Sequence, residues 1–508
     1  MMRQGLHTLA ALLFAAHAAG AQDADSSRVR HGPPIRRIAT ASAVSTQTFG
    51  ALTDVLELPG GRVLVNDGER RQLLLLDTTL TLVRVVLDSV SETEDTYGNR
   101  SGTIIPYRGD STLFIDPTSL ALLVLDSAAN VARVRSVPRV QDVRWYTSRS
   151  GGFSRMGTDA RGRLVYRINA QAARPARRPP RGVPYIPQQP DSAFVVAVDL
   201  DTRLVDTLGT IRIPKSDFVV RLRPTGGYDV DQAINPLPMT DEWAVLPDGA
   251  IAFVRGIDYR VEYLDGDGTW ASSPKLPYDW QPMSDDAKKQ LVDSVGAAQV
   301  ARARTSYATS VIRWVNQYGR KSYPDGFAAP EGYRPPQGFG KDWVLPQGVS
   351  FPENYIYACA SGEEPTIVGR NADADDDDEP PMDTRGRGGF GGGRPSCIPA
   401  PVPNTNTPPA PRLREPGVVS AQLLPDFKPP FATGAVRADA DGNLWIRSIP
   451  PRRIPGGPIY DIVNRAGELV DRLQLPTGYQ IVGFGKGKVV YLAMRDAGQT
   501  KLARVMLR

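Results

Sequence analysis

Residues 437–446 read RADADGNLWI, in which two aspartates stand close to a glycine and an asparagine, the residue types of a calcium loop. An EF-hand loop needs its glycine at position six and a bidentate glutamate at position twelve. Counted from Asp439, the glycine is fourth and the twelfth residue is Pro450. The spacing therefore predicts a tight turn between two strands, as it does for LDGDGTW (264–270).

The densest group of acids is the run from Asp375 to Glu379, which has the charge to collect cations. A preformed calcium site must hold its oxygen ligands around the ion. This run lies beside proline and glycine, which fix no such geometry, so it is interpreted as solvated chain.

Histidine chemistry is excluded from the folded body. The chain has three histidines, of which His7 and His17 fall in a predicted leader and His31 precedes any folded pattern. This removes a Ser-His-Asp triad, a histidine-ligated metal and a histidine general base. Carboxylate, Lys, Tyr or Arg chemistry and oxygen-ligated calcium remain open, and no cofactor is expected.

The N-terminal stretch has the features of a secretory signal peptide. Arg3 precedes the apolar run LAALLFAA, and small residues end the stretch before Gln22, where cleavage is expected. The alternative, a membrane anchor, would need about 20 apolar residues, and no later segment approaches that length. We therefore expect a periplasmic or secreted protein with no transmembrane segment.

Two cysteines, Cys359 and Cys397, follow this leader. Disulfides form and persist in an oxidising compartment, so a bridge between them is predicted. The formal net charge of +5 is spread over 508 residues without a long basic tract, so no nucleic-acid partner is expected.

Short strands separated by glycine-containing turns recur along the chain, and each unit of four strands is typical of a propeller blade. Turns such as PGGRVLV and PDGAIAFVR share one position in the unit, where glycine supplies the positive φ of a tight hairpin. The units are 54–87, 102–137, 156–167 with 192–211, 243–277, 436–476 and 479–508.

DADGNLWIR followed by YDIVNRAGELVDRLQLP (460–476) resembles the NHL-type or TolB-like six-bladed β-propellers, and in particular exported bacterial propellers without an assigned activity. The resemblance covers about 48–277 and 431–508. It implies an all-β, six-bladed propeller whose last blade is closed by an N-terminal strand. The candidate for that strand is IRRIATASAVSTQTF (35–49).

A long insertion separates the fourth and fifth units and departs from a plain propeller. It opens with a helix near 284–304, where Ser284 can cap the N-terminus and Ala287, Leu291, Val295 and Ala298 share a face. The expected division is a signal peptide (1–21), a flexible tail (22–34), four blades with the closing strand (35–277), the insertion (278–430, disordered at 363–412) and two blades (431–508).

Propellers bind ligands at the central channel and on the loops of one face, so polar loop segments are candidates. Arg223, Asp229, Arg255 and Tyr259 could form a polar pocket. Alternatively, such charged residues pair with each other and fill the channel. Trp445 follows a turn and is predicted to be a core residue.

The sequence favours a non-catalytic binding or protein-interaction module that acts as a monomer on a protein or small-molecule ligand that it does not identify. The alternative is a carboxylate- or calcium-dependent propeller enzyme, lactonase- or lyase-like, that uses the central channel. That alternative rests on analogy of fold alone.

Overall fold

The structure is a computed structural model. It describes residues 32–89, 96–146, 156–169, 184–186, 190–214, 217–222, 228–318, 358–359, 397–398, 416–452, 454–496 and 498–507. The chain divides into two compact units, a β-rich unit that holds most of the strands and a second unit formed by 231–234 and 289–419. Each unit is described by itself.

The β-rich unit is built from antiparallel sheets that follow one another along the chain. Three sheets have four strands each: β7 (Thr103–Pro106), β8 (Thr112–Asp116), β9 (Ala121–Leu125) and β10 (Val131–Ser136); β11 (Gly157–Thr158), β12 (Leu164–Asn169), β13 (Ser192–Val198) and β14 (Val205–Arg212); β17 (Glu242–Val245), β18 (Ile251–Arg255), β19 (Arg260–Leu264) and β20 (Trp270–Ser272). A fourth contains β23 (Phe431–Ala438), β24 (Leu444–Ser448), β25 (Ile459–Val463) and β26 (Leu469–Gln474).

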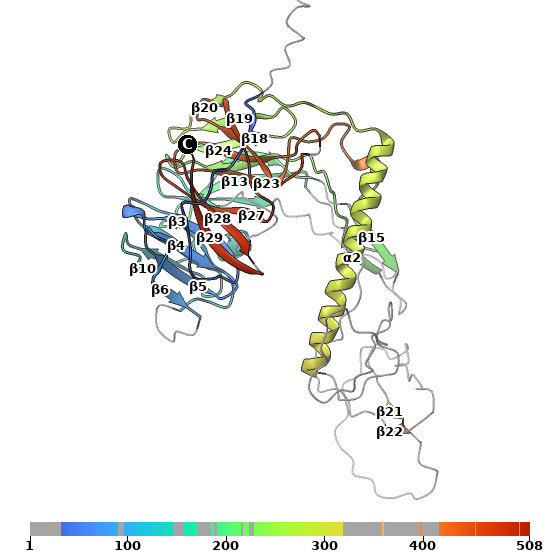
Figure 1. Cartoon of the computed structure of the whole chain (residues 1–508), viewed down its shortest axis with the longest axis horizontal. Helices are drawn as coiled ribbons and strands as arrows, with labels where there is room; N and C mark the ends of the chain where they lie inside the picture. The colour runs from blue at the N-terminus through green and yellow to red at the C-terminus, as the bar shows by residue number, and fades with distance from the viewer. Residues whose placement is uncertain are drawn as a thin grey trace, which may run out of the picture. The chain divides into compact units, whose positions relative to one another are not determined.

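The two ends of the chain meet in one eight-stranded sheet. Its strands are β2 (Ala43–Val44), β3 (Leu52–Glu57), β4 (Val63–Asp67), β5 (Gln72–Leu76), β6 (Leu82–Asp88), β27 (Tyr479–Gly485), β28 (Val489–Asp496) and β29 (Gln499–Met506). β27 joins the halves by pairing in parallel with β3, and Figure 1 shows the red strands β27–β29 beside the blue strands β3–β5. The close approach of β27 to β3 requires glycine at position 483, because a Cβ there would lie 2.2 Å from the Val55 carbonyl oxygen.

The first strands of successive groups lie next to one another, in the order β27, β3, β7, β11, β17 and β23. Arg437 of β23 donates to the carbonyl oxygen of Ile481 in β27, which brings the last neighbour in that order back to the first. Sheets arranged with their first strands around a common axis form a β-propeller. The chain is therefore an all-β propeller with additional segments.

The core lies between consecutive sheets, which explains why central strands are apolar on both faces. In β5, Leu73 and Leu75 pack in a cluster with Phe114 of β8, while Leu74 and Leu76 pack in a cluster with Tyr491 of β28. Side chains alternate across a strand. The run QLLLL therefore fills two interfaces at once, a pattern that a sheet with one solvated face would not show.

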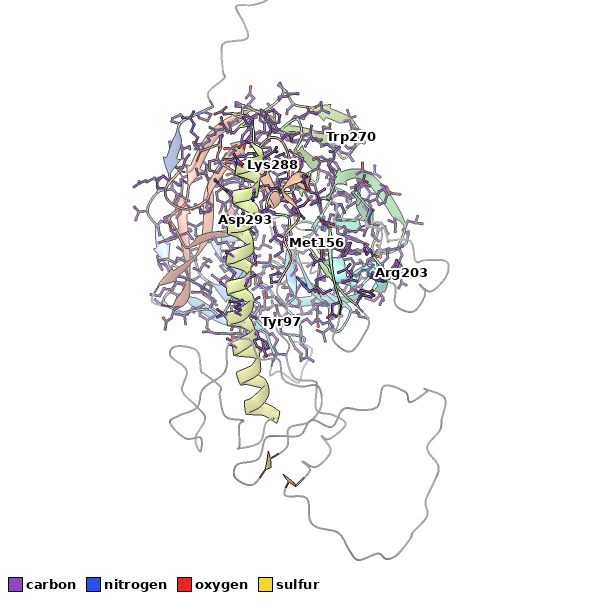
Figure 2. The ribbon with its side chains drawn as sticks, turned by 90° about the vertical axis from the view of Figure 1, so that its right-hand side faces the viewer. Tyr97, Met156, Arg203, Trp270, Lys288 and Asp293 are labelled. Atoms are coloured by element: carbon purple, nitrogen blue, oxygen red, sulfur yellow. The ribbon has the colours of Figure 1, made fainter. Side chains whose placement is uncertain are left out.

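The two ends of the propeller carry different connections. In a four-stranded meander, the first and third turns lie at one end of the sheet, and the second turn and the link to the next sheet lie at the other. Short turns such as 77–81 and 439–443 occupy the first end, here called the turn end. The long segments 170–191, 213–241 and 273–430 all leave from the second, the connection end. Figure 2 labels Arg203, which belongs to a short turn-end hairpin.

The N-terminal segment pairs with two different sheets. β2 pairs antiparallel with β29, with Ala43 opposite Arg504, and a bridge joins Phe49 to Thr500. This is the closing pairing that the resemblance implied. The expectation of a single strand over 35–49 differs from the structure, because β1 (Ile35–Arg37) pairs in parallel with β26 instead. Arg36 forms an ion pair with Asp471 at this edge.

The long helix α2 (Asp285–Tyr318) begins where the sequence predicts and ends later. The Ser284 hydroxyl accepts a hydrogen bond from the Ala287 amide at 3.2 Å, as expected of the cap. The helix continues past residue 304 because neither proline nor glycine occurs at 305–318, and Gly319 directly follows its last residue. Of the predicted face, Leu291 and Val295 are half-buried, whereas Ala287 and Ala298 are exposed. None of the helices in the described ranges is long and apolar enough to cross a membrane.

Two short pairings complete the description. β15 (Phe218–Leu222) pairs with β16 (Tyr228–Gln232), and β21 (Ala358–Cys359) pairs antiparallel with β22 (Cys397–Ile398). Cys359 lies opposite Cys397 in that register. Directly opposite residues have Cα atoms about 4.5–5.5 Å apart, within the span of a disulfide. The bridge stays a prediction. The predicted disorder at 363–412 falls mostly outside the described residues.

Candidate functional site

The four residues predicted to form a polar pocket are not all brought together. Arg223 lies outside the described residues. Asp229 is on β16, within the connection between β14 and β17, and Arg255 ends β18. Tyr259 follows in the connection from β18 to β19. These three positions belong to connections or strand ends at the connection end, but Arg255 and Tyr259 enter separate hydrogen-bond clusters.

Arg255 is engaged inside the protein. Its guanidinium donates to Glu262 at 2.8 Å, to Asp241 at 3.1 Å and to the carbonyl oxygen of Thr210 at 2.8 Å. Arg260 donates to the other carboxylate oxygen of Glu262 at 2.9 Å. The cluster joins β14, the start of β17 and β19. This is the alternative weighed from the sequence, in which Arg and acidic residues pair with each other.

Asp241 fixes the segment that leads into β17. Besides Arg255, its carboxylate accepts from the backbone amides of Arg212, at 3.1 Å, and Gly256, at 3.0 Å. Thr240 donates from its hydroxyl to the carbonyl oxygen of Arg212 at 3.0 Å. Three consecutive polar residues, Thr240, Asp241 and Glu242, are thus buried where a strand begins at the connection end.

Tyr259 is buried and does not offer its hydroxyl to a ligand. The side chain is 0 % exposed, and the hydroxyl donates to Asp461 at 2.6 Å. Asp461 also accepts from Arg472 at 3.1 Å and from Ser448 at 3.4 Å. Burial raises the pKa of Tyr259 well above its usual value and raises the pKa of Asp461 as well. The expected pocket residue is instead part of a buried joint between two sheets.

Glu242 is a buried acid with a shifted pKa that was not predicted from the sequence. Its side chain is 1 % exposed and accepts from the backbone amide of Gly434 in β23. Burial raises the pKa of Glu242 to about 7, and the amide of Gly434 and the charge of Arg167 oppose that rise. One signal could have found it: Glu242 alternates in phase with Ala244, a core residue, and so belongs to an inward face.

The turn at Asp439 is a hairpin in which neighbouring residues donate hydrogen bonds to the aspartate carboxylate. The Asp439 carboxylate accepts from the backbone amides of Asp441 and Asn443 and from the indole N–H of Trp445. Gly442 takes φ +88°, which glycine adopts without strain. Trp445 is 2 % exposed, so its prediction as a core residue is confirmed.

The same turn chemistry recurs around the turn end. The carboxylates of Asp77, Asp126 and Asp159 each accept from the amides two and four residues later. The second calcium candidate, 264–270, forms the turn between β19 and β20. Among the described residues, no three His, Cys, Asp or Glu side chains are grouped so as to hold a metal ion. The run from Asp375 to Glu379 lies outside those residues.

Chelation is expected to leave the melting temperature within about 1 °C of its untreated value, since a bound ion would stabilise the native state by mass action. Asp439→Ala is expected to lower stability by about 1–3 kcal/mol equally with and without EDTA, because it removes the acceptor of the buried Trp445 indole and of two partly buried backbone amides. Differential scanning calorimetry measures both. A fall of several degrees with EDTA that calcium restores would contradict the turn interpretation.

No family model matches the chain, and no curated protein matches it. Solved structures that it resembles include a virginiamycin B lyase from Staphylococcus aureus (8% identity, 92% of this chain and 99% of that chain, TM-score 0.30). A gluconolactonase from Xanthomonas campestris has 9% identity over 94% and 99% of the chains, with TM-score 0.30. The calcium-binding protein regucalcin from Agrobacterium tumefaciens has 10% identity over 93% and 98%, with TM-score 0.31. TM-scores this low do not establish a shared fold, so the assignment of this chain as a propeller rests on its strand pairing.

Proposed function

We propose that the chain is an exported, monomeric six-bladed propeller that acts as a binding module for a protein or small-molecule partner. The blade count follows if the eight-stranded sheet is divided at its one parallel junction, between β27 and β3. β3–β6 then make one blade, and β27–β29 with β2 make another. The signal-peptide pattern at 1–21 supports export.

The observation that carries the proposal is the asymmetry between the two ends of the propeller. Its turn end consists of short hairpins whose aspartates are satisfied by backbone amides, as at Asp126 and Asp439. Between the described strands, the long connections leave from the other end. Binding residues are found disproportionately on loops that a rigid scaffold positions. We therefore place partner contacts at the connection end, which carries Asp229 and Ile257.

The enzyme alternative draws less support from the described residues. A carboxylate- or calcium-dependent active site needs acids that are available to a substrate or ion. Asp241 and Glu262 are engaged by Arg255, and Asp461 is engaged by Arg472 and Tyr259. No specific observation favours the enzyme over the binding module.

The proposal is tested with a photo-crosslinking amino acid placed at either end of the propeller. Ile257, at the connection end, is 48 % exposed, and Leu204, in a turn-end hairpin, is 69 % exposed, so both are exposed apolar residues and the control position is the more accessible of the two. Adducts are expected from position 257 and not from 204 when the protein is irradiated in its native compartment. Equal labelling from both positions would refute a binding role for the connection end.

A further inference from the structure

The interface between the sheet β11–β14 and the sheet β17–β20 has unpaired polar groups at its connection end. The indole N–H of Trp243 has no hydrogen-bond partner, although the side chain is only 1 % exposed. The amide oxygen of Asn169 is also buried without a donor. A buried polar atom that is left unpaired costs free energy and is rare in native proteins. An unpaired donor and an unpaired acceptor together indicate a site that another molecule completes.

Strand geometry places both residues on this one interface. Val165 of β12 packs in one cluster with Trp243 of β17. Side chains alternate along a strand, so Asn169 projects from the same face of β12 as Val165. Ala193, which lies opposite Asn169 in β13, belongs to the same cluster. Asn169 ends β12 and Trp243 is the second residue of β17, so both lie where these strands meet the long connections.

Arg167 adds a cation to the same face of β12. It lies between Val165 and Asn169 in the alternating pattern, and its side chain is half-buried. It interacts electrostatically with Glu242, the residue before Trp243. In the part of the chain that the structure describes, its guanidinium forms neither a hydrogen bond nor an ion pair. A guanidinium presents five N–H donors in a planar fork that matches a carboxylate.

The interface around these three side chains is closed by other contacts. Toward the turn end, a Cβ on Gly157 would lie 2.8 Å from the Val245 side chain, so the two sheets are in close contact there. Beside β14, the Asp241 carboxylate accepts from the Arg212 amide at 3.1 Å. The unpaired donors and the unpaired acceptor are therefore grouped at one place, and the half-buried side chains of β12 leave that place accessible from solvent.

The chemistry of these groups selects the ligand. Arg167 and the indole N–H of Trp243 supply donors and a positive charge, which suit a carboxylate. The amide oxygen of Asn169 suits a neutral O–H or N–H donor, because a buried ammonium group would need a counter-charge. We propose that Arg167, Asn169 and Trp243 bind a small carboxylate with a hydroxyl or an amide N–H on the adjacent carbon, as in a 2-hydroxy acid or an N-acylated amino acid.

This inference rests on the proposed binding function and names the class of ligand for the connection end. The connection 170–191 leaves directly after Asn169, and the connection 213–241 ends just before Glu242. A ligand held by Arg167, Asn169 and Trp243 lies beside the strand ends from which both connections run. The site is therefore at the end of the propeller to which partner contacts are assigned.

Lactate and N-acetylglycine are the probes, added to the full-length protein while the indole N–H signal of Trp243 is followed by heteronuclear NMR. Trp243→Phe removes that signal and so assigns it. Both probes are expected to shift the signal, because the N–H gains an acceptor, and to bind saturably at millimolar concentrations. Propionate, which lacks the hydroxyl, and lactamide, which lacks the charge, are expected to bind on the order of tenfold more weakly.

Variants of the three residues test their roles by calorimetric titration with lactate. Arg167→Gln, Asn169→Leu and Trp243→Phe are each expected to weaken binding on the order of tenfold. Trp445→Phe is the matched control, because Trp445 is 2 % exposed and its indole N–H already donates to Asp439. It is expected to bind lactate as the wild type does. Should Trp243→Phe fail to fold, the two variants in β12 decide the result, since their side chains are only half-buried.

The proposal is overturned if neither probe binds, which would mean that only buried water pairs with these groups. Binding that is unchanged in both Arg167→Gln and Asn169→Leu would overturn it as well. Failure of the proposed binding function is detected separately, by crosslinking from Ile257. Crosslinked adducts without probe binding would refute the ligand site alone. Probe binding that the variants weaken, without adducts, would support the ligand site and refute the wider role of the connection end.

Discussion

A variant that begins at Gly50 is expected to aggregate, because removal of the preceding segment exposes the edge of β29. The segment forms backbone hydrogen bonds with that strand through Ser42, Ser45 and Phe49. The Ser45 hydroxyl also accepts from the Leu502 amide at 3.0 Å, and Phe49 is 3 % exposed. An unpaired strand edge is a template for association with another chain.

The expected cost is a large part of the total stability. Burial of one phenylalanine contributes about 1.5–3 kcal/mol, and each hydrogen bond about 0.5–1.5 kcal/mol. A typical domain is stable by only about 5–15 kcal/mol. Size-exclusion chromatography with light scattering and thermal unfolding measure the result.

The control for this truncation is a variant that begins at Gly32, which keeps β1 and β2 and is expected to remain monomeric with an unchanged melting temperature. A variant beginning at Ile38 separates the two pairings, since it loses β1 and its contact with β26 but keeps β2. It is expected to lose little stability, because β1 is exposed along its length. If the Gly50 variant were as monomeric and as stable as the Gly32 variant, closure by this segment would be refuted.

The repeating sheets were predictable because their signals are local. A glycine that must take positive φ, as at Gly442, and an aspartate that binds amides two and four residues later lie within one turn of chain. The apolar runs that follow fix which strands are buried on both faces. The segment 35–49 lacks such local signals, and its split between β26 and β29 depends on the edges that two distant sheets happen to offer.

The side chains of the site were harder to predict because their partners are distant in sequence. For Arg255 the sequence left two interpretations open, a polar pocket and pairing with acidic residues, and it did not identify the acceptors, which come from β19 and from the residue before β17. In the sequence, Glu242 is an acidic residue at the start of a strand. Glu242 accepts a hydrogen bond from Gly434, which lies beyond the long insertion in the sequence. A single sequence does not reveal which loop residue will meet a residue so far along the chain.

Asp461→Ala is expected to destabilise the protein by about 3–5 kcal/mol, because it leaves a partly buried guanidinium without its counter-charge. The Asp461 side chain is 1 % exposed and that of Arg472 is 23 % exposed. The substitution also leaves the hydroxyl of Tyr259 without its acceptor. Tyr259→Phe, which removes only the donor, is expected to cost about 1–3 kcal/mol. Equilibrium unfolding in urea measures each change.

Asp471→Ala is the matched control on the neighbouring strand, since Asp471 pairs with an Arg36 side chain that is 50 % exposed. Exposed ion pairs contribute about 0–1 kcal/mol, so this variant should be nearly as stable as wild type. The double variant Asp461→Ala with Tyr259→Phe should lose less stability than the sum of the two single losses, because each single change already breaks the shared hydrogen bond. Additive losses, or an Asp461→Ala cost no greater than that of Asp471→Ala, would mean that the buried joint does not hold the two sheets together.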